Sequence, residues 1–331
     1  MKEEEKHFLL TIRICLAAVI VILAFLSVLM LPLLDPSALQ KAVAWTTRPP
    51  DSKWSAPDSL SIKESPNAEL IHYGQELVAH TSRYLGPQGT VASISNGMNC
   101  QNCHLQVGKK IFGNNFSAVA STYPKFRARS GTVESVEKRI NDCIERSLNG
   151  TALDTASMEM KGIAAYIRWV GKDVPKGKIP HGAGIADVPL LNRAANPDKG
   201  KEVYESNCAR CHGTSGVRHP DGKQWLYPPL WGSDSYNTGA GIFRISRLAG
   251  YIKMNMPNEG GVNRKVLSDE EAWDVAAYIN SMPRPTKDIA QDWPELSTKP
   301  FDHPFGPYAD GFSEAQHKYG PFQPILDAHK K

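Results

Sequence analysis

The sequence lacks a strong net charge. Its 38 Lys and Arg residues nearly balance 34 Asp and Glu residues, which leaves a formal charge of +4 over 331 residues. An excess this small and this evenly spread argues against a nucleic-acid partner. Apolar residues make up 41% and charged residues 22%, which are ordinary values for globular chains. The composition therefore argues against wholesale disorder, collagen-like repeats and a polytopic membrane protein.

Cysteine is also scarce, with six in the chain. An even number is typical of disulfides in an exported protein, but the spacing of the cysteines decides whether that interpretation holds. The length predicts about two domains, at roughly 150 residues per domain.

The amino terminus carries one long apolar run. Residues 1–13 include basic side chains and are predicted to be cytoplasmic, and the uncharged apolar residues 14–34 follow. At about 1.5 Å per helical residue this run just spans a hydrocarbon core of about 30 Å. Residues 35–38 supply no clear small-x-small cleavage site, so we expect a transmembrane anchor, with a cleaved signal peptide as the alternative.

Changes in composition divide the rest of the chain. Residues 35–66 are rich in proline and predict an extended stalk. Apolar periodicity and capping residues predict helices over residues 67–85, 132–148 with Thr132 as its cap, 157–170, 197–207 and 268–281. The predicted units are a domain at 67–180, a linker at 181–195, a second domain at 196–285 and a proline- and aromatic-rich extension at 286–331.

The two predicted domains repeat one pattern. Each contains a helix, a cysteine motif, a loop-rich middle and a closing helix with the residues Ala-Ala-Tyr-Ile, at 164–167 and 276–279. This self-similarity predicts two tandem copies of one small all-α fold. The many aromatic residues of the extension suggest a segment wrapped over the domains, with a solvated tail as the alternative.

The cysteine motifs explain four of the six thiols. Cys100-Gln-Asn-Cys103-His104 and Cys208-Ala-Arg-Cys211-His212 are CxxCH sequences, the attachment signature of c-type haem. Two thiols at this spacing reach the two vinyl groups of one porphyrin, and the adjacent imidazole can ligate the iron. A thioredoxin-type dithiol or half of a zinc site are weaker alternatives, because both copies carry the histidine. We therefore expect two covalently bound haem c groups.

The haem motifs also indicate the compartment. Haem is attached in this way outside the bacterial cytoplasm, so both domains are predicted to lie on the periplasmic side of the inner membrane. The domains together are predicted to be class I cytochrome c-type domains, in tandem behind the N-terminal transmembrane helix.

The second iron ligand differs between the domains. Met256-Pro257 lies ahead of the closing helix of the second domain, where a class I cytochrome c presents its thioether, and Met254 and Met282 are the competing candidates. A neutral sulfur opposite histidine raises the reduction potential. The first domain has no Met-Pro between His104 and its closing helix.

Cys143 is the thiol left over in the first domain. Arg139, Cys143 and Ser147 are spaced at i, i+4 and i+8, which places them on one face of the predicted helix. A nearby cation favours the thiolate, which is both the nucleophilic and the metal-binding form. From the residues alone, a haem ligand or reactive thiol and a core cysteine are comparably supported.

The chain resembles the thiosulfate dehydrogenase family of dihaem cytochromes c. The resemblance covers residues from about 67 to 285, and its most specific part is the block at 123–150, YPKFRARSGTVESVEKRINDCIERSLNG. The resemblance implies that Cys143 is the distal ligand of the first haem, that Arg129 and Arg139 bind an anionic substrate with Ser147 nearby, and that Met256 ligates the second haem. Some members place a lysine before that methionine, where this chain has Asn255.

The resemblance further implies a reaction. Two thiosulfate ions would be joined into tetrathionate, or tetrathionate reduced by the same groups. The electrons would leave through the second haem to a small periplasmic c-type cytochrome. The rival hypothesis is a membrane-anchored dihaem electron carrier without a substrate of its own, against which the polar cluster around Cys143 argues.

Overall fold

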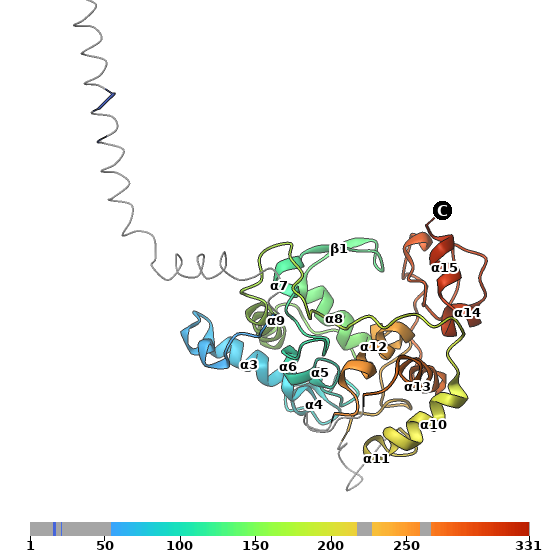
Figure 1. The fold of residues 1–331 in the computed structure, drawn as a ribbon. Coiled ribbons are helices and arrows are strands. Elements are labelled where there is room, and N and C mark those ends of the chain that lie inside the picture. The colour runs from blue at the N-terminus through green and yellow to red at the C-terminus, as the bar shows by residue number, and fades with distance from the viewer. Residues whose placement is uncertain (1–15, 18–20, 22–53, 217–226, 259–265, 331) are drawn as a thin grey trace, which may run out of the picture. The chain divides into compact units, whose positions relative to one another are not determined.

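The computed structural model describes residues 16, 17, 21, 54–216, 227–258 and 266–330 (Figure 1). The predicted cytoplasmic residues 1–13 lie outside this part of the chain, as does the apolar run 14–34 apart from three helical residues. Among the described residues, no helix has both the length and the apolarity that a membrane crossing needs.

The first half of the described chain is built mainly from helices and one hairpin. In order, its elements are the 3-10 helix η2 (Ser59–Glu64), α3 (Ala68–Ala79), α4 (Thr81–Leu85), α5 (Cys100–Cys103), α6 (Leu105–Gly108), α7 (Val119–Thr122), β1 (Lys125–Arg127), β2 (Thr132–Glu134), α8 (Val136–Arg146) and α9 (Met158–Val170).

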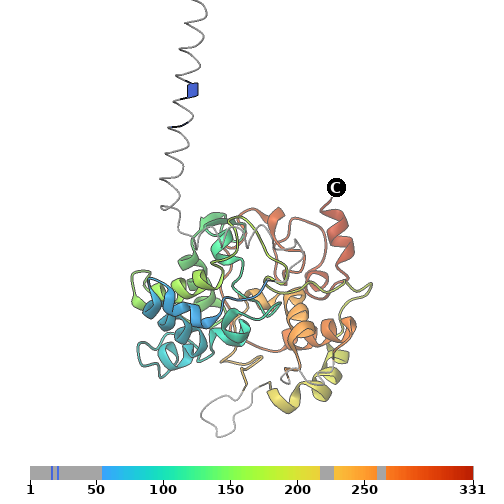
Figure 2. The same cartoon turned by 60° about the vertical axis from the view of Figure 1, so that its left-hand side comes forward.

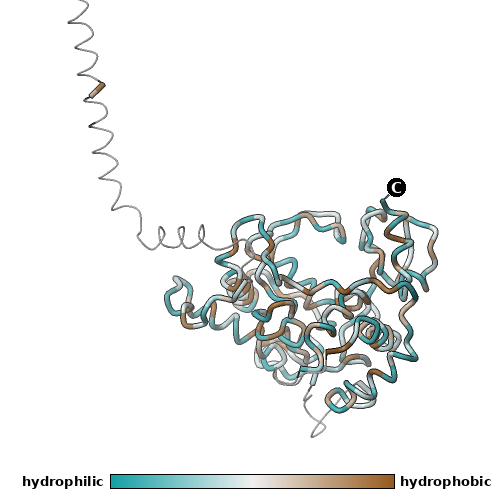
Figure 3. The backbone as a smooth tube through the Cα atoms, viewed as in Figure 1, coloured by the Kyte–Doolittle hydropathy of each residue, from teal (hydrophilic) through white to brown (hydrophobic). Residues whose placement is uncertain are grey.

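The named elements within the described residues of the second half are all helices. Its elements are α10 (Pro197–Asn207), α11 (Ala209–His212), η3 (Gly241–Phe243), α12 (Ile245–Asn255), α13 (Asp269–Ser281), η4 (Leu296–Thr298), α14 (Glu314–Tyr319) and α15 (Gln323–Ala328). Figures 1 and 2 show the blue to green elements of the first half beside the yellow to red elements of the second. Figure 3 shows both apolar (brown) and hydrophilic (teal) residues along the helices of both halves, as expected for helices that bury one face.

Both halves use the same close helix crossing. The opening helix α3 packs on the closing helix α9, and α10 packs on α13 in the same way. A Cβ atom on Gly74 would lie 1.9 Å from the carbonyl oxygen of Gly162, and one on Gly200 would lie 1.9 Å from that of Asp274. Glycine in the opening helix therefore lets two backbones touch in each half. The repeated packing agrees with the internal repeat found in the sequence.

Gly200→Ala should destabilise the second half because the added methyl group would meet a backbone carbonyl that cannot rotate away. Overpacking of this kind costs about 1–3 kcal/mol of unfolding free energy. Denaturant unfolding of the haem-loaded protein measures this loss. Gly311→Ala is the control because nothing lies within 4 Å of a Cβ at that position. Equal stability of the two variants would contradict the close crossing.

Three of the helices predicted from the sequence are confirmed. Helix α10 spans Pro197–Asn207, and Ser157 and Ser268 cap α9 and α13 with their side-chain oxygens. Ser268 also forms a capping box with Glu271. The local signals sufficed here because caps act within one turn of the helix.

The predicted start of a helix at Thr132 is wrong, because α8 begins at Val136. The prediction of an all-α fold is also incomplete, because it misses the two-stranded sheet of β1 and β2. Residues 132–134 form strand β2, which pairs antiparallel with β1. Ser135 is the N-cap, and its side chain accepts from the backbone N–H of Lys138. Gly131 has a φ of 64°, a left-handed turn conformation that glycine adopts without strain, and the β-branched Thr132 and Val133 suit the strand that follows.

The predicted stalk and first helix also need correction. Residues 54–66 were expected to be extended, but Trp54 and Ile62 are buried in the core of the first half. The helix predicted over 67–85 breaks at His80 into α3 and α4. Just after the break, the Thr81 hydroxyl donates to the Leu77 carbonyl and its oxygen accepts from the N–H of Cys100, at 2.9 Å. The break thus ties the opening helix to the cysteine motif.

The carboxyl-terminal extension packs on the body of the protein. Trp293, Phe322 and Ile325 are buried, and Ile325 has no exposed surface. The Asp302 carboxylate is fully buried and pairs with Arg244. This packing confirms the wrapped segment expected from the aromatic content, and the solvated tail is wrong.

Polar side chains join the two halves directly. The Asn237 amide donates to the Glu145 carbonyl at 2.8 Å. The Tyr251 hydroxyl donates to the Asn102 carbonyl at 2.8 Å, inside the first cysteine motif. The Asn255 amide donates to the carbonyl of Phe112 at 3.0 Å. Helix α12 of the second half is therefore bonded to the loop that carries the first motif.

Candidate functional site

A cavity of about 350 Å³ lies beside the first cysteine motif. Its volume is in the range of ligand sites. The residues around it come from the first half, from Ile185 in the segment between the halves and from residues 241–247 of the second half. The cavity brings together all the residues predicted for the first haem and its substrate, namely Cys100, Cys103, His104, Arg129, Arg139, Cys143 and Ser147.

The two thiols of the first motif are neutral in their surroundings. Burial raises the pKa of Cys100 to about 11 and that of Cys103 to about 12, with a smaller effect in the same direction from Cys143. The pair fits covalent attachment of haem, because the CxxCH spacing also supplies the adjacent His104.

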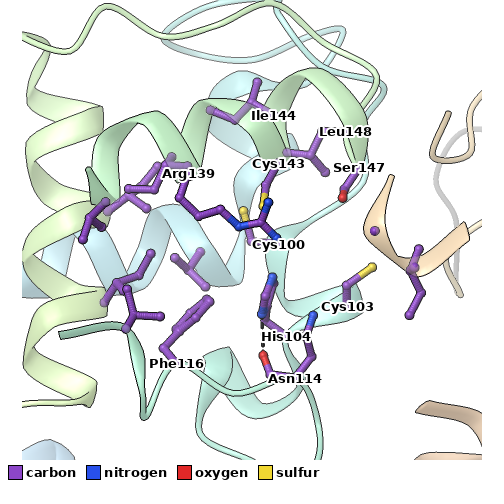
Figure 4. Close-up of a pocket in the computed structure, with 18 of the residues that line it drawn as sticks. Cys100, Cys103, His104, Asn114, Phe116, Arg139, Cys143, Ile144, Ser147 and Leu148 are labelled. Atoms are coloured by element: carbon purple, nitrogen blue, oxygen red, sulfur yellow. Dashed lines mark hydrogen bonds between the residues drawn. The ribbon is translucent and has the colours of Figure 1, made fainter. Parts of the chain in front are cut away.

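His104 has the geometry of an iron ligand. Its Nδ1 atom bonds the Asn114 carbonyl (Figure 4), and the ring lies 4.5 Å from that of Phe116 between centroids. Burial lowers its pKa to about 4, so the imidazole is neutral at physiological pH. A neutral ring that donates from Nδ1 keeps the lone pair on Nε2, and a backbone carbonyl fixes its orientation.

Helix α8 carries the predicted reactive face. Ser135 caps the N-terminus of this helix. Arg139, Cys143 and Ser147 then follow at helical spacing and line the cavity. In Figure 4 the Arg139 side chain extends toward Cys143, Cys100 and His104. The pKa of Arg139 is raised, chiefly by its electrostatic interaction with Cys143, and burial opposes this effect. The guanidinium is therefore charged at neutral pH.

Five arginines line the cavity, and its described lining residues include no carboxylate. The five are Arg127, Arg129, Arg139, Arg244 and Arg247. Arg244 pairs with Asp302 and Arg247 with Asp187, whereas the other three form no ion pair within the described residues. Burial and the neighbouring Arg139 lower the pKa of Arg129 to about 10, which leaves it protonated at pH 7. The arrangement suits a small dianion.

Sequence reasoning missed three of these arginines. Arg127 stands two residues before Arg129, and this spacing could have indicated that both belong to one turn at the site. Arg244 and Arg247 come from the start of α12 in the second half. No local pattern in the sequence connects them with a cavity about a hundred residues earlier.

The second motif presents its histidine in the same way as the first. The His212 Nδ1 atom lies 3.4 Å from the Pro228 carbonyl oxygen, and burial lowers its pKa. Met256 ends helix α12 and is partly buried against the core of the second half, whereas Met254 is 37% exposed. Residues 217–226 and 259–265, which lie in the same half, are outside the described residues.

In a comparison with known protein families, each half of the chain matches a different cytochrome c model. Residues 90–175 match the SoxA/TsdA cytochrome c domain, and residues 195–279 match subunit III of cbb3-type cytochrome c oxidase. The thiosulfate dehydrogenase of Psychrobacter arcticus is 35% identical over 241 residues, which cover 72% of this chain and 71% of the relative. That of Allochromatium vinosum is 36% identical over 251 residues, which cover 73% and 88%.

The chain belongs to the thiosulfate dehydrogenase family. A solved thiosulfate dehydrogenase (TsdBA) from Marichromatium purpuratum superposes with a TM-score of 0.63 at 30% identity. The match covers 71% of this chain and 50% of the other, so this chain spans about half the length of that structure.

As in other members of the thiosulfate dehydrogenase family, two cytochrome c domains imply two covalently bound haem c groups. The residues present fit these groups. In each half, the histidine of the CxxCH motif has its Nδ1 atom facing a backbone carbonyl. In the second half, Asn255 directly precedes Met256, and its side-chain amide donates to the backbone carbonyls of Phe112 and Tyr251.

Proposed function

We propose that this protein oxidises two thiosulfate ions to tetrathionate in the cavity beside Cys143. The observation that carries the proposal is the set of five arginines that line the cavity together with Cys143, beside the first haem motif, with no carboxylate among the described lining residues. The names of the relatives, thiosulfate dehydrogenases at up to 36% identity, support the same substrate. Two thiosulfate dianions repel one another, and Arg127, Arg129 and Arg139 would offset that repulsion while bonding the sulfonate oxygens.

The proposed chemistry uses the Cys143 sulfur as a carrier. The Cys143 thiolate bonds the terminal sulfur of one thiosulfate, which gives a cysteine S-thiosulfonate and releases two electrons. The terminal sulfur of a second thiosulfate then attacks the same sulfur and displaces the thiolate, as in thiol exchange. The products are tetrathionate and the original thiolate, so sulfur and charge balance. The reverse sequence reduces tetrathionate with the same groups.

His104 and Cys143 would hold the first haem, and His212 and Met256 the second. When bound, the two haems would supply the acceptors for the two electrons. A thiolate ligand favours ferric iron, whereas a thioether raises the potential, so electrons would flow toward the second haem. They would leave to a small c-type cytochrome on the periplasmic side of the inner membrane. Residues 14–34 would anchor the protein there.

Mixing the oxidised protein with thiosulfate tests the proposal most directly. Absorbance in the haem region should show reduction of both haems, and tetrathionate should appear in the product. The rival electron carrier would leave the haems oxidised under the same conditions, although a reduced cytochrome would still reduce them. That pattern would remove thiosulfate as the substrate.

Met256→Gly should lower the reduction potential of the second haem and change its spectrum, because the neutral sulfur ligand would be lost. Thiosulfate should still reduce the first haem. Redox titration followed by absorbance measures the effect. Met254→Leu is the matched control, since that side chain lies one residue before Asn255 on the same helix and is 37% exposed. A titration unchanged by Met256→Gly would assign the ligand elsewhere.

A further inference from the structure

The carboxyl-terminal extension contacts two arginines of the cavity, Arg244 and Arg129, through side chains of different chemistry. Asp302 accepts from Arg244 Nε at 2.7 Å and from the Ser246 N–H at 3.0 Å, so a carboxylate offsets that charge. Trp293 instead places its ring 5.3 Å from the Arg129 guanidinium carbon. An aromatic face attracts a cation through its quadrupole and leaves the formal charge in place.

Trp293 is itself firmly held. It is 5% exposed, and the His303 ring meets it edge-on at 4.3 Å between centroids. Its φ of 54° lies in the left-handed region, which a bulky residue adopts when its surroundings fix it. The preceding Asp292 accepts two bonds of 2.8 Å from Arg146 at the end of α8. The indole is therefore a rigid support.

The same segment also fixes the hairpin that carries Arg129. The backbone N–H of Trp293 donates to the backbone carbonyl of Arg129 at 2.7 Å. Pro294 packs on Gly131, where a Cβ would lie 2.7 Å from the proline ring. Both the backbone and the side chain of Arg129 thus rest on residues 293 and 294, more than 160 positions away in the sequence. Arg129 Nε is buried without a hydrogen-bond partner in the described structure, so its hydrogen-bonding capacity is unused there.

We propose that the extension supports the substrate site, and that Trp293 is a positioning residue that holds Arg129, which forms no ion pair among the described residues, for a sulfur-oxyanion dianion. The inference rests on the proposed function for the identity of that dianion. In this proposal Asp302 neutralises Arg244, whereas Trp293 holds Arg129 for binding of the dianion.

Thiosulfate binding to the fully reduced protein, which cannot oxidise it, tests the role of Trp293 by calorimetry alongside steady-state kinetics. Trp293→Leu should raise both Kd and KM about tenfold while kcat changes less than about twofold. Trp293→Phe, which keeps an aromatic face, should retain most of the affinity. Phe301→Leu is the control, since Phe301 packs on Phe322 at 5.3 Å between centroids in the same extension.

A double-mutant cycle shows whether Trp293 acts through Arg129. In an Arg129→Ala background, Trp293→Leu should cause no further loss of affinity. An equal loss in both backgrounds, or a loss in Phe301→Leu as large as that in Trp293→Leu, would overturn the inference and leave the proposed function intact. A wild-type protein that neither binds nor oxidises thiosulfate would overturn both.

Discussion

Cys143→Ala should abolish thiosulfate oxidation, with a fall in kcat of at least about a thousandfold, because the reaction would lose the sulfur that carries the first thiosulfate. The side chain lines the cavity and is close enough to Cys100 and Cys103 to raise the pKa of both. Steady-state kinetics with thiosulfate measures the loss. Both haems should remain attached, because their four cysteines are untouched.

Cys143→Ser separates sulfur chemistry from packing. Serine keeps a polar atom of similar size at this partly buried position but is a much weaker nucleophile toward sulfur. It should therefore be as inactive as alanine, with two haems by pyridine haemochrome and an unchanged unfolding midpoint. Retention of more than about a tenth of the wild-type kcat in either variant would remove the thiol from the mechanism.

Arg139→Gln should lower kcat/KM about a hundredfold, a loss typical of removing one preorganised electrostatic contact. Arg139 lies one turn before Cys143, and the interaction between them raises the pKa of the arginine. The neutral amide would no longer stabilise the thiolate, which should lower kcat, nor attract a dianion, which should raise KM. Stability should change little, since Arg139 forms no ion pair in the described part of the chain.

Arg139→Lys provides the matched comparison. Lysine keeps the positive charge but lacks the planar fork that bonds two sulfonate oxygens at once. Its kcat/KM should fall between those of the wild type and the glutamine variant. A lysine variant as impaired as glutamine would show that geometry outweighs charge, whereas full activity of the glutamine variant would exclude Arg139 from the site.

The parts of the site that depend on local pattern could be predicted from the sequence. The CxxCH motifs are contiguous, and Arg139, Cys143 and Ser147 follow helical spacing, so one turn of helix predicts their neighbours. The start of that helix was placed too early, because Thr132 is both a good cap and a good strand residue. The turn at Gly131 and the packing of Pro294 on it favour the strand.

The remaining parts depend on contacts between distant segments. Arg244 reaches the cavity because α12 of the second half packs against the first, and Trp293 reaches Arg129 because the extension folds back over the hairpin. Neither contact produces a periodic pattern of residues from which it could be predicted. The aromatic content of the extension predicted that it would pack, but not what it would touch.

Helix α12 has a consequence for the speed of electron flow. Its Tyr251 bonds the first cysteine motif, its Asn255 bonds Phe112, and the predicted ligand Met256 follows at once. Two cytochromes joined by a loose tether must collide productively before an electron passes, and thickening the solvent slows that encounter. Here hydrogen bonds already hold the two halves together. Under the proposed function, the internal electron transfer should therefore proceed at the same rate in buffer and in concentrated sucrose.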